Sequence, residues 1–252
     1  MKTADIMVKQ GYWLFRYRSY LPLVILAFAL ACMWTHRTMY KSDSVLFDIL
    51  CLCISLCGEA IRIITVGFAP NRTSGRNRTK QVAKELNQTG IYSLFRHPLY
   101  VGNFFMWLGI AIYSKIWWLV IIFILVYWLY YERIIMAEED FLKSKFGEDY
   151  EQYSSRVNAI LPRFKAYVQN KYTFRFKKAL RQDYSSFYGL IVVFLAVRLY
   201  QNWLSRGKIS LETHWIAIGS TVTVLYLILL ALWKWTKLLK IEKETEKKFS
   251  RE

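Results

Sequence analysis

The stretch "VLFDILCLCISLCGEAIRIITVGFA", residues 45–69, is apolar over most of its length. A helix of about 20 predominantly apolar residues crosses a bilayer, so this run is long enough to span one. Three charged residues interrupt it, Asp48, Glu59 and Arg62. Charges at membrane depth are costly unless they pair with one another or face a polar cavity. The stretch therefore predicts a membrane helix whose charged side chains pack as ion pairs or line a site.

Similar runs recur along the 252-residue chain, 55% of which is hydrophobic. They cover residues 20–34, 99–113, 116–131, 185–204 and 215–235. The runs 99–113 and 116–131 are each short and together too long for one span, so Ser114 and Lys115 are expected to turn a hairpin. We predict an all-α fold, a polytopic integral-membrane helical bundle of about six transmembrane helices, with loops and a helix on the cytoplasmic side.

The formal net charge of +17 is distributed by loop rather than gathered on one soluble module. This distribution disfavours nucleic acid as a partner. The positive-inside rule places the N-terminus, the basic connector around residues 71–84, the segment 132–184 and the basic tail on the cytoplasmic side. We expect an integral membrane protein with both termini cytoplasmic. The four cysteines lie in apolar runs without histidine partners, so no metal site is expected.

The stretch "FRHPLYVG", residues 95–102, opens one of the apolar runs. Pro98 is tolerated in the first turn of a helix but disfavours helix at the residue before it, so a helix is predicted to begin at about Pro98. Arg96 and His97 stand just ahead of this start, where free backbone N–H groups can help to hold an anion. Gly102 permits close approach of a ligand or another helix. An interfacial anchor is the alternative interpretation.

A second polar cluster, "ERIIMAEEDFLKSKFGEDYEQYSSRV", residues 132–157, continues the fourth run out of the membrane. Glu132 and Glu139 are two helical turns apart and share a face, and Gly147 is a plausible helix stop. A solvated helix face would explain such a charge run. The shared cytoplasmic side with Arg96 and His97 favours a functional cluster instead.

These motifs together resemble the isoprenylcysteine carboxyl methyltransferase and phospholipid methyltransferase family of integral-membrane methyltransferases. The resemblance runs over about residues 90–164, through "GIYSLFRHPLYVGN", a helical hairpin, "AEEDFLKSKFGEDYEQYSSRV" and "LPRF". It implies three parts: N-terminal transmembrane helices and connector (1–89), a methyltransferase core (90–164) and a C-terminal helical pair with a basic tail (165–252). It also implies S-adenosyl-L-methionine as the cofactor. The motif-matched cofactor residues are Tyr92, Arg96, His97, Pro98, Tyr100, Gly102, Glu138, Glu139, Tyr150 and Tyr153.

The implied reaction is methyl transfer to a membrane lipid or lipidated substrate. A carboxylate or phosphate oxygen is already anionic and needs only a cation to hold it, for which Arg62, Arg96 and Arg156 are the candidates. The stretch "RVNAILPRF" departs after Arg156 from the pattern of the prenylcysteine enzymes. The alternatives are a phospholipid amine N-methyltransferase, a sterol-reductase-like enzyme that uses a nicotinamide cofactor, and a non-catalytic lipid-binding membrane protein.

Overall fold

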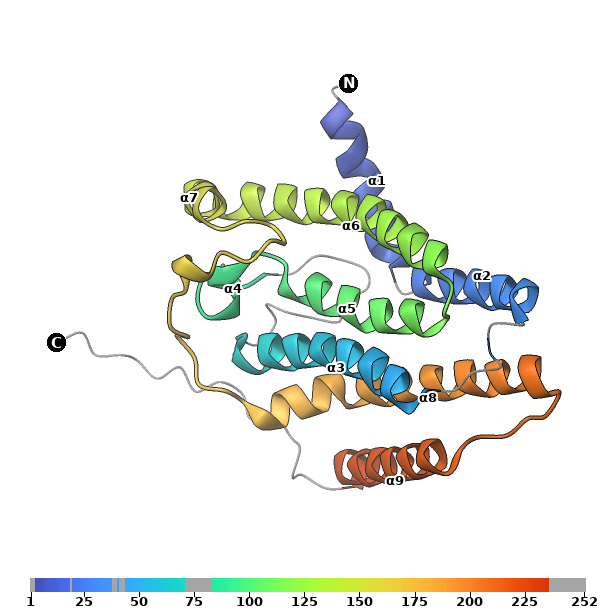
Figure 1. Cartoon of the computed structure of the whole chain (residues 1–252). Helices are drawn as coiled ribbons and strands as arrows, with labels where there is room; N and C mark the ends of the chain where they lie inside the picture. Colours follow the sequence, from blue (N-terminus) through green and yellow to red (C-terminus); the bar gives the residue numbers. More distant parts are fainter. Residues whose placement is uncertain (1–2, 19, 38–39, 41–43, 71–82, 236–252) are drawn as a thin grey trace.

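The computed structural model describes residues 3–18, 20–37, 40, 44–70 and 83–235, which form helices joined by loops and contain no strand (Figure 1). This confirms the predicted all-α fold. The basic connector residues Arg72, Arg76, Arg78 and Lys80 and the tail beyond Trp235 lie outside the described residues. The elements are α1 (Thr3–Tyr17), α2 (Leu21–Thr35), α3 (Val45–Phe68), α4 (Ile91–Leu94), α5 (Pro98–Tyr113), α6 (Trp117–Phe146), α7 (Glu148–Arg156), the 3-10 helix η2 (Phe164–Ala166), α8 (Phe176–Arg206) and α9 (Thr213–Trp235).

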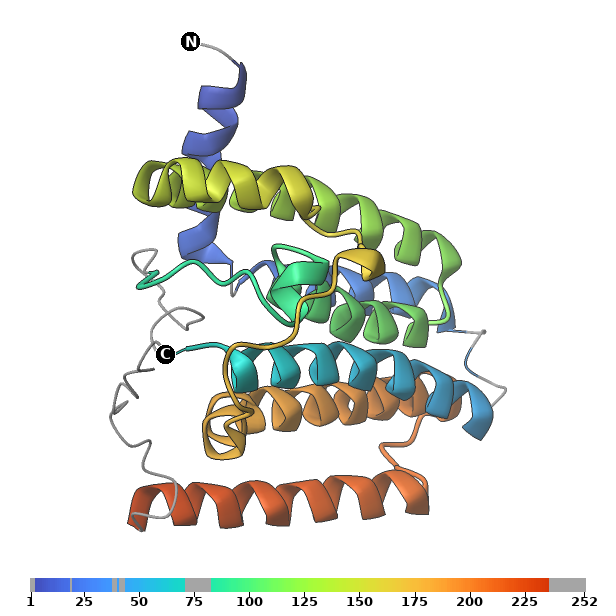
Figure 2. The same cartoon turned by 90° about the vertical axis from the view of Figure 1, so that its left-hand side faces the viewer.

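The long helices lie in a stack, in the order α6, α5, α3, α8 and α9 (Figures 1 and 2). Four of them, α3, α6, α8 and α9, are long and apolar enough to cross a membrane, and α1 with α2 forms a fifth candidate if the bent pair is one span. α5 is a shorter apolar helix of 16 residues. A multi-pass membrane bundle is therefore confirmed, and the count of six spans stays a prediction.

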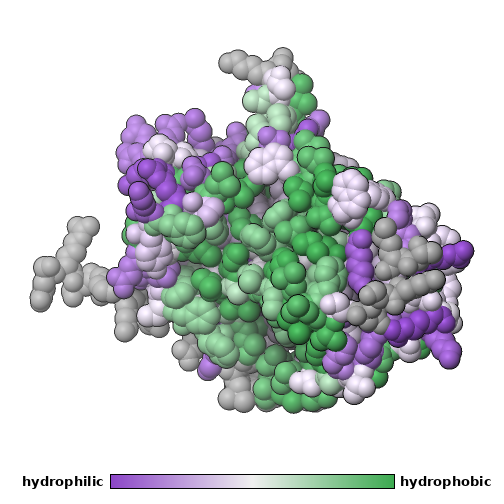
Figure 3. All heavy atoms as spheres, viewed as in Figure 1, coloured by the Kyte–Doolittle hydropathy of each residue, from purple (hydrophilic) through white to green (hydrophobic). Residues whose placement is uncertain are grey.

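A hydrophobic band crosses the visible face of the molecule, between two hydrophilic ends (Figure 3). One end carries α7 and the start of α5, and the other carries the turns that follow α5 and α8 (Figure 1). Many large apolar side chains on α3, α6 and α9 are exposed, among them Leu46, Leu125 and Leu227. Exposed apolar surface of this extent indicates contact with lipid.

The turn between α5 and α6 forms at Ser114 and Lys115, as predicted. Lys115 has a φ of 59°, the left-handed conformation that a tight turn requires. The Ser114 hydroxyl donates to the Ala111 carbonyl at 2.6 Å, and the Tyr40 hydroxyl donates to the Ser114 carbonyl at 2.9 Å. These bonds satisfy the buried hydroxyl and carbonyl of Ser114 at the end of α5.

Helices α3 and α5 approach closely because small residues line their interface. A Cβ atom added to Gly58 would lie 2.4 Å from the carbonyl oxygen of Gly102, and one added to Gly102 would lie 2.6 Å from Cγ of Arg62. The Ser55 hydroxyl donates to the Met106 carbonyl across the same interface at 2.7 Å. Small residues and interhelical hydrogen bonds are the usual means of packing membrane helices. This packing brings Arg62 against α5.

The N-terminal helix α1 packs on α6, an arrangement that the sequence did not predict. The Tyr12 hydroxyl donates to Asp140 at 3.1 Å, and the Tyr130 hydroxyl donates to the Leu14 carbonyl at 3.0 Å. Gly11 allows the contact, since a Cβ atom there would overlap the Arg133 carbonyl. α1 thereby covers the side of α6 next to the cluster that contains Glu138 and Glu139.

Candidate active site

The polar motif before α5 is hydrogen-bonded to the segment that follows α7. Helix α5 begins at Pro98 with His97 as its N-cap, which confirms the predicted helix start. The backbone N–H groups of Arg96 and His97 donate to the carbonyls of Asn158 and Ala159, at 2.9 and 3.1 Å. The N–H groups ahead of the helix are therefore satisfied by protein.

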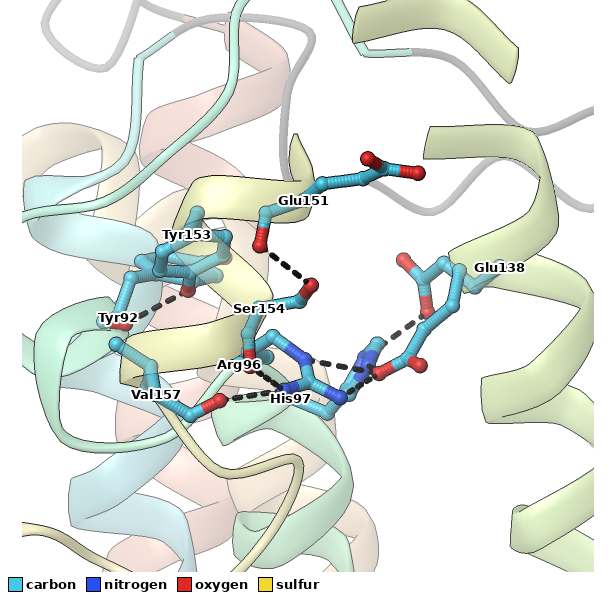
Figure 4. Close-up of polar contacts among 9 residues, drawn as sticks. Tyr92, Arg96, His97, Glu138, Glu151, Tyr153, Ser154 and Val157 are labelled. Atoms are coloured by element: carbon cyan, nitrogen blue, oxygen red, sulfur yellow. Dashed lines mark hydrogen bonds and ion pairs between the residues drawn. The ribbon is translucent and has the colours of Figure 1, made fainter. Parts of the chain in front are cut away.

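Arg96 joins three elements through its guanidinium (Figure 4). Its Nε and Nη2 donate to one carboxylate oxygen of Glu139, at 2.9 and 2.5 Å. Its Nη1 donates to the carbonyls of Ser154, at 3.0 Å, and Val157. Most of the guanidinium donors are thus used within the protein, so Arg96 holds α6 and the end of α7 against the start of α5.

His97 lies between two glutamates of α6. Its Nδ1 is 3.4 Å from Glu138 Oε2, and its Nε2 is 3.1 Å from Glu139 Oε1 (Figure 4). Burial lowers the pKa of His97, but hydrogen bonds and the charges of Glu138 and Glu139 outweigh burial and raise this pKa to about 9. His97 is therefore an imidazolium at neutral pH.

Tyrosines complete the polar cluster. The Tyr100 hydroxyl donates to Glu138 at 2.9 Å, and the Tyr153 hydroxyl donates to the Tyr92 carbonyl at 2.7 Å. Burial raises the pKa of Tyr150 and Tyr153 far above the usual tyrosine range, so both phenols stay neutral and can donate hydrogen bonds.

A cavity of about 650 Å³ opens beside this cluster. Its volume lies in the range of small-molecule sites, which is about 300–1,000 Å³. The wall near the motif is polar and aromatic, and further along α5 and α8 it becomes apolar. The motif-matched residues on the wall are Tyr92, Arg96, His97, Pro98, Tyr100, Glu138, Tyr150 and Tyr153. The apolar part includes Met106, Trp107, Ile110, Leu190 and Val193.

Three predicted site residues do not line the cavity. Gly102 faces α3, where it serves helix packing. Glu139 stands behind Arg96 and His97 and holds both. Arg156 is exposed on α7, and its Nε donates to the Gln152 carbonyl of the same helix at 3.1 Å. The structure thus brings most of the predicted cofactor residues together but leaves Arg156 apart from them.

The cavity also contains a cluster that the sequence analysis only partly foresaw. Arg62, a predicted site residue, donates to Asp183 of α8 at 2.5 Å and to Asn103 of α5. Asp183 was missed because the apolar run was expected to begin at residue 185, whereas α8 begins at Phe176. An acidic residue directly before a predicted span is the signal that points to it.

These features define an all-helical membrane bundle in which a polar motif stands at one end of a cavity whose other end is apolar. The profile of the family described as "Phospholipid methyltransferase" matches residues 73–149. The matched part covers the start of α5, the hairpin and the glutamates of α6. Residues 73–149 therefore resemble this family, and the predicted resemblance is confirmed.

Individual relatives agree with the family match. The chain is 33% identical over 126 residues to the protein-S-isoprenylcysteine O-methyltransferase of Schizosaccharomyces pombe, covering 50% of this chain and 50% of the relative. It is 33% identical over 118 residues to a probable protein-S-isoprenylcysteine O-methyltransferase of Oryza sativa subsp. indica, covering 44% and 59%. The chain therefore spans about half the length of these relatives.

A longer match joins the chain to a protein with a different name. The nickel-cobalt-cadmium resistance protein NccN of Alcaligenes xylosoxydans xylosoxydans is 29% identical over 198 residues, covering 76% of this chain and 89% of the relative. No solved structure gives a significant match.

Proposed function

We propose that the chain is an S-adenosyl-L-methionine-dependent membrane methyltransferase that methylates a lipid or lipidated acceptor. The observation that carries this proposal is the single cavity, which joins a polar end built from the family motifs to an apolar end between α5 and α8. A water-soluble cofactor and a lipid acceptor can meet in such a space. The printed names of the isoprenylcysteine O-methyltransferase relatives support the same reaction class.

The residues at the polar end fit S-adenosyl-L-methionine. Glu138 lines the cavity and is partly exposed, so it can accept hydrogen bonds from an amino group or a ribose. The faces of Tyr92, Tyr100, Tyr150 and Tyr153 offer flat surfaces for an adenine ring and a cation. When bound there, the cofactor supplies an electrophilic methyl group.

This chain contributes orientation and exclusion of water to the reaction. Arg96 and Glu139 fix the relative positions of α5, α6 and α7, because one arginine contacts all of them. The apolar wall of Met106, Ile110 and Val193 keeps water from the part of the cavity nearest to lipid. Correct placement and desolvation are the main requirements of a displacement at a methyl group.

Incubation with labelled S-adenosyl-L-methionine tests the proposal. Purified protein in detergent would be given prenylcysteine, aminophospholipid, lipid-phosphate and long-chain alcohol acceptors, and binding of the cofactor would be measured by calorimetry. We expect cofactor binding and transfer of label to at least one acceptor. Binding of a nicotinamide cofactor in its place would support the reductase-like alternative. Lipid binding without either cofactor would support a non-catalytic protein.

A further inference from the structure

The middle of the cavity contains a polar cluster built by three helices. Arg62 of α3 donates to Asp183 Oδ1 of α8 at 2.5 Å and to the side-chain oxygen of Asn103 of α5. All three residues line the cavity, between the cofactor motif and the apolar wall. Arg62 and Asp183 lie outside the matched residues 73–149, so the family match assigns them no role.

Asp183 has an oxygen that the described protein does not satisfy. The residue is 3% exposed, and its Oδ2 has no hydrogen-bond partner among the described residues. A buried carboxylate oxygen without a donor is unfavourable, because it has lost its water and gained nothing in return. Since Asp183 lines a cavity large enough for a ligand, the unpaired oxygen points to a ligand that donates a hydrogen bond.

The charges around Arg62 disfavour an anionic ligand at this place. Besides Asp183, Arg62 faces Glu59, whose Oε2 lies 3.6 Å from its Nε and which is 2% exposed. Two carboxylates therefore surround one guanidinium. The other cation on this part of the wall, Arg18, lies over the Phe15 ring beyond α1. A carboxylate or phosphate beside Asp183 would be repelled by the Asp183 carboxylate in a medium of low dielectric constant.

We propose that Asp183 binds the methyl acceptor and that the acceptor atom carries a proton. This inference rests on the proposed methyltransferase function. The acceptor group is then an amine, bound as an ammonium, or a hydroxyl, and its lipid chain lies along Met106, Ile110 and Leu190. Arg62, which Asn103 holds in turn, is a positioning residue that binds Asp183 Oδ1 and leaves Oδ2 for the acceptor. Two guanidinium nitrogens of Arg62 are then engaged by Asp183 and Asn103 and do not hold the acceptor.

In the proposed methyl transfer, Asp183 takes the proton that the acceptor must lose. For an amine, Oδ2 takes one proton from the bound ammonium and frees the nitrogen lone pair. The lone pair forms a bond to the methyl carbon of S-adenosyl-L-methionine, while the carbon–sulfur bond breaks and its electron pair stays on sulfur. The products are the methylated ammonium and S-adenosylhomocysteine, and Asp183 then releases its proton to water. For a hydroxyl, Oδ2 takes the O–H proton as the oxygen forms the new bond.

Asp183→Asn tests the inference, because asparagine keeps the shape and can still accept from Arg62 but cannot take a proton. Wild-type full-length protein and the variant would be assayed with phosphatidylethanolamine, a long-chain alcohol, phosphatidic acid and a farnesylcysteine. We expect transfer of the methyl group only to the amine or to the alcohol. The substrate that becomes methylated identifies the accepting group. Asp183→Asn should lower kcat by about 100-fold or more, the scale of losing a general base, with unchanged cofactor affinity.

Asp149→Asn is the matched control, because Asp149 is an exposed carboxylate on α7 and is not on the cavity wall. Its kcat should equal that of the wild type. Methylation of phosphatidic acid or farnesylcysteine by the wild type, or full activity in Asp183→Asn, would overturn the inference and leave the methyltransferase function standing. The wild-type acceptor profile decides the matter even if the variant fails to fold. Absence of both cofactor binding and transfer to every acceptor would overturn the two proposals together.

Discussion

At the scale of single residues, His97 combines burial with two acidic neighbours. It is a buried imidazolium between Glu138 and Glu139, and it also lines the cavity. Glu139 does not line the cavity but contacts Arg96 and His97, which do. These contacts predict that the two residues affect the cofactor in different ways, His97 on the cavity wall and Glu139 as its support.

We predict that His97→Ala and Glu139→Gln each weaken S-adenosyl-L-methionine binding by roughly tenfold or more, the scale of losing a hydrogen bond to a charged group. Calorimetric titration of the cofactor into purified variants measures the effect. Glu148→Gln is the control, because Glu148 is exposed on α7 and should leave the affinity unchanged. If neither variant alters the affinity, the cluster is an interfacial anchor and not a cofactor site.

The raised pKa of His97 predicts a pH dependence of stability. The folded-state pKa of about 9 exceeds the ordinary value of 6.5, so the folded protein binds the proton more tightly than the unfolded chain. The stabilisation is therefore fully present below about pH 6.5 and is lost as the pH rises through about 9. It amounts to about 3 kcal/mol from the size of the shift, as an order of magnitude. Thermal melting of wild type and His97→Gln between pH 6 and 10 should show a difference that shrinks as the pH rises. A constant difference would contradict the assignment of the charge to His97.

At the scale of helices, the interface between α3 and α5 fixes the position of Arg62 in the cavity. Gly58→Ala would place a methyl group 2.4 Å from the Gly102 carbonyl oxygen and 2.6 Å from the Met106 nitrogen. Backbone atoms cannot move aside easily, so the helices must separate. We predict a destabilisation of about 1–3 kcal/mol, the usual cost of overpacking, and a lower Tm in detergent.

Gly189→Ala is the matched control for this prediction. Gly189 lies within α8, and no described atom comes within 4 Å of the position of its added Cβ. Alanine has a higher helix propensity than glycine, by about 1 kcal/mol, so this variant should melt at the same or a higher temperature. Equal Tm changes in the two variants would show that the α3–α5 contact is looser than the structure indicates.

The sequence predicted those helix boundaries that local signals determine. Pro98 starts α5, the Ser114–Lys115 pair turns the hairpin and Gly147 ends α6, each through the conformational preference of one or two residues. The packing of α1 on α6 was not predictable in the same way. It depends on contacts between Tyr12 and Asp140, which lie far apart in the chain and carry no shared local pattern.

The candidate site was likewise predictable only where local sequence motifs determine it. The residues at the polar end of the cavity could be predicted because they stand in two short motifs, and their role in cofactor binding stays a prediction. The cluster of Arg62, Asn103 and Asp183 was not, because it joins three helices that meet only in the folded bundle. The sequence marked Arg62 as a buried charge in need of a partner but offered Glu59 alone, three residues away on the same helix. The stronger partner comes from α8.

At the scale of the whole molecule, the connections alternate between two polar ends of the bundle (Figures 1 and 3). The end with the cofactor motif carries Lys143, Lys145, Lys165 and Lys171, whereas the opposite turns carry Lys115, Arg206 and Lys208. Cytoplasmic loops of membrane proteins carry the excess of Lys and Arg. We propose on this basis that the end with the polar motif faces the cytoplasm, and the cytoplasmic position of both termini stays a prediction.

Single-cysteine labelling tests this orientation. In a background in which Cys32, Cys51, Cys53 and Cys57 are replaced by alanine, Lys165→Cys and Lys208→Cys would be exposed to a membrane-impermeant thiol reagent in intact cells. Both positions are exposed, on η2 and in the loop between α8 and α9, so accessibility to the reagent depends on the side of the membrane. We expect labelling of Lys208→Cys in intact cells, and labelling of Lys165→Cys only after the membrane is opened. Labelling of Lys165→Cys in intact cells would place the motif outside, away from the cytosolic supply of S-adenosyl-L-methionine, and the cofactor assignment would fall with it.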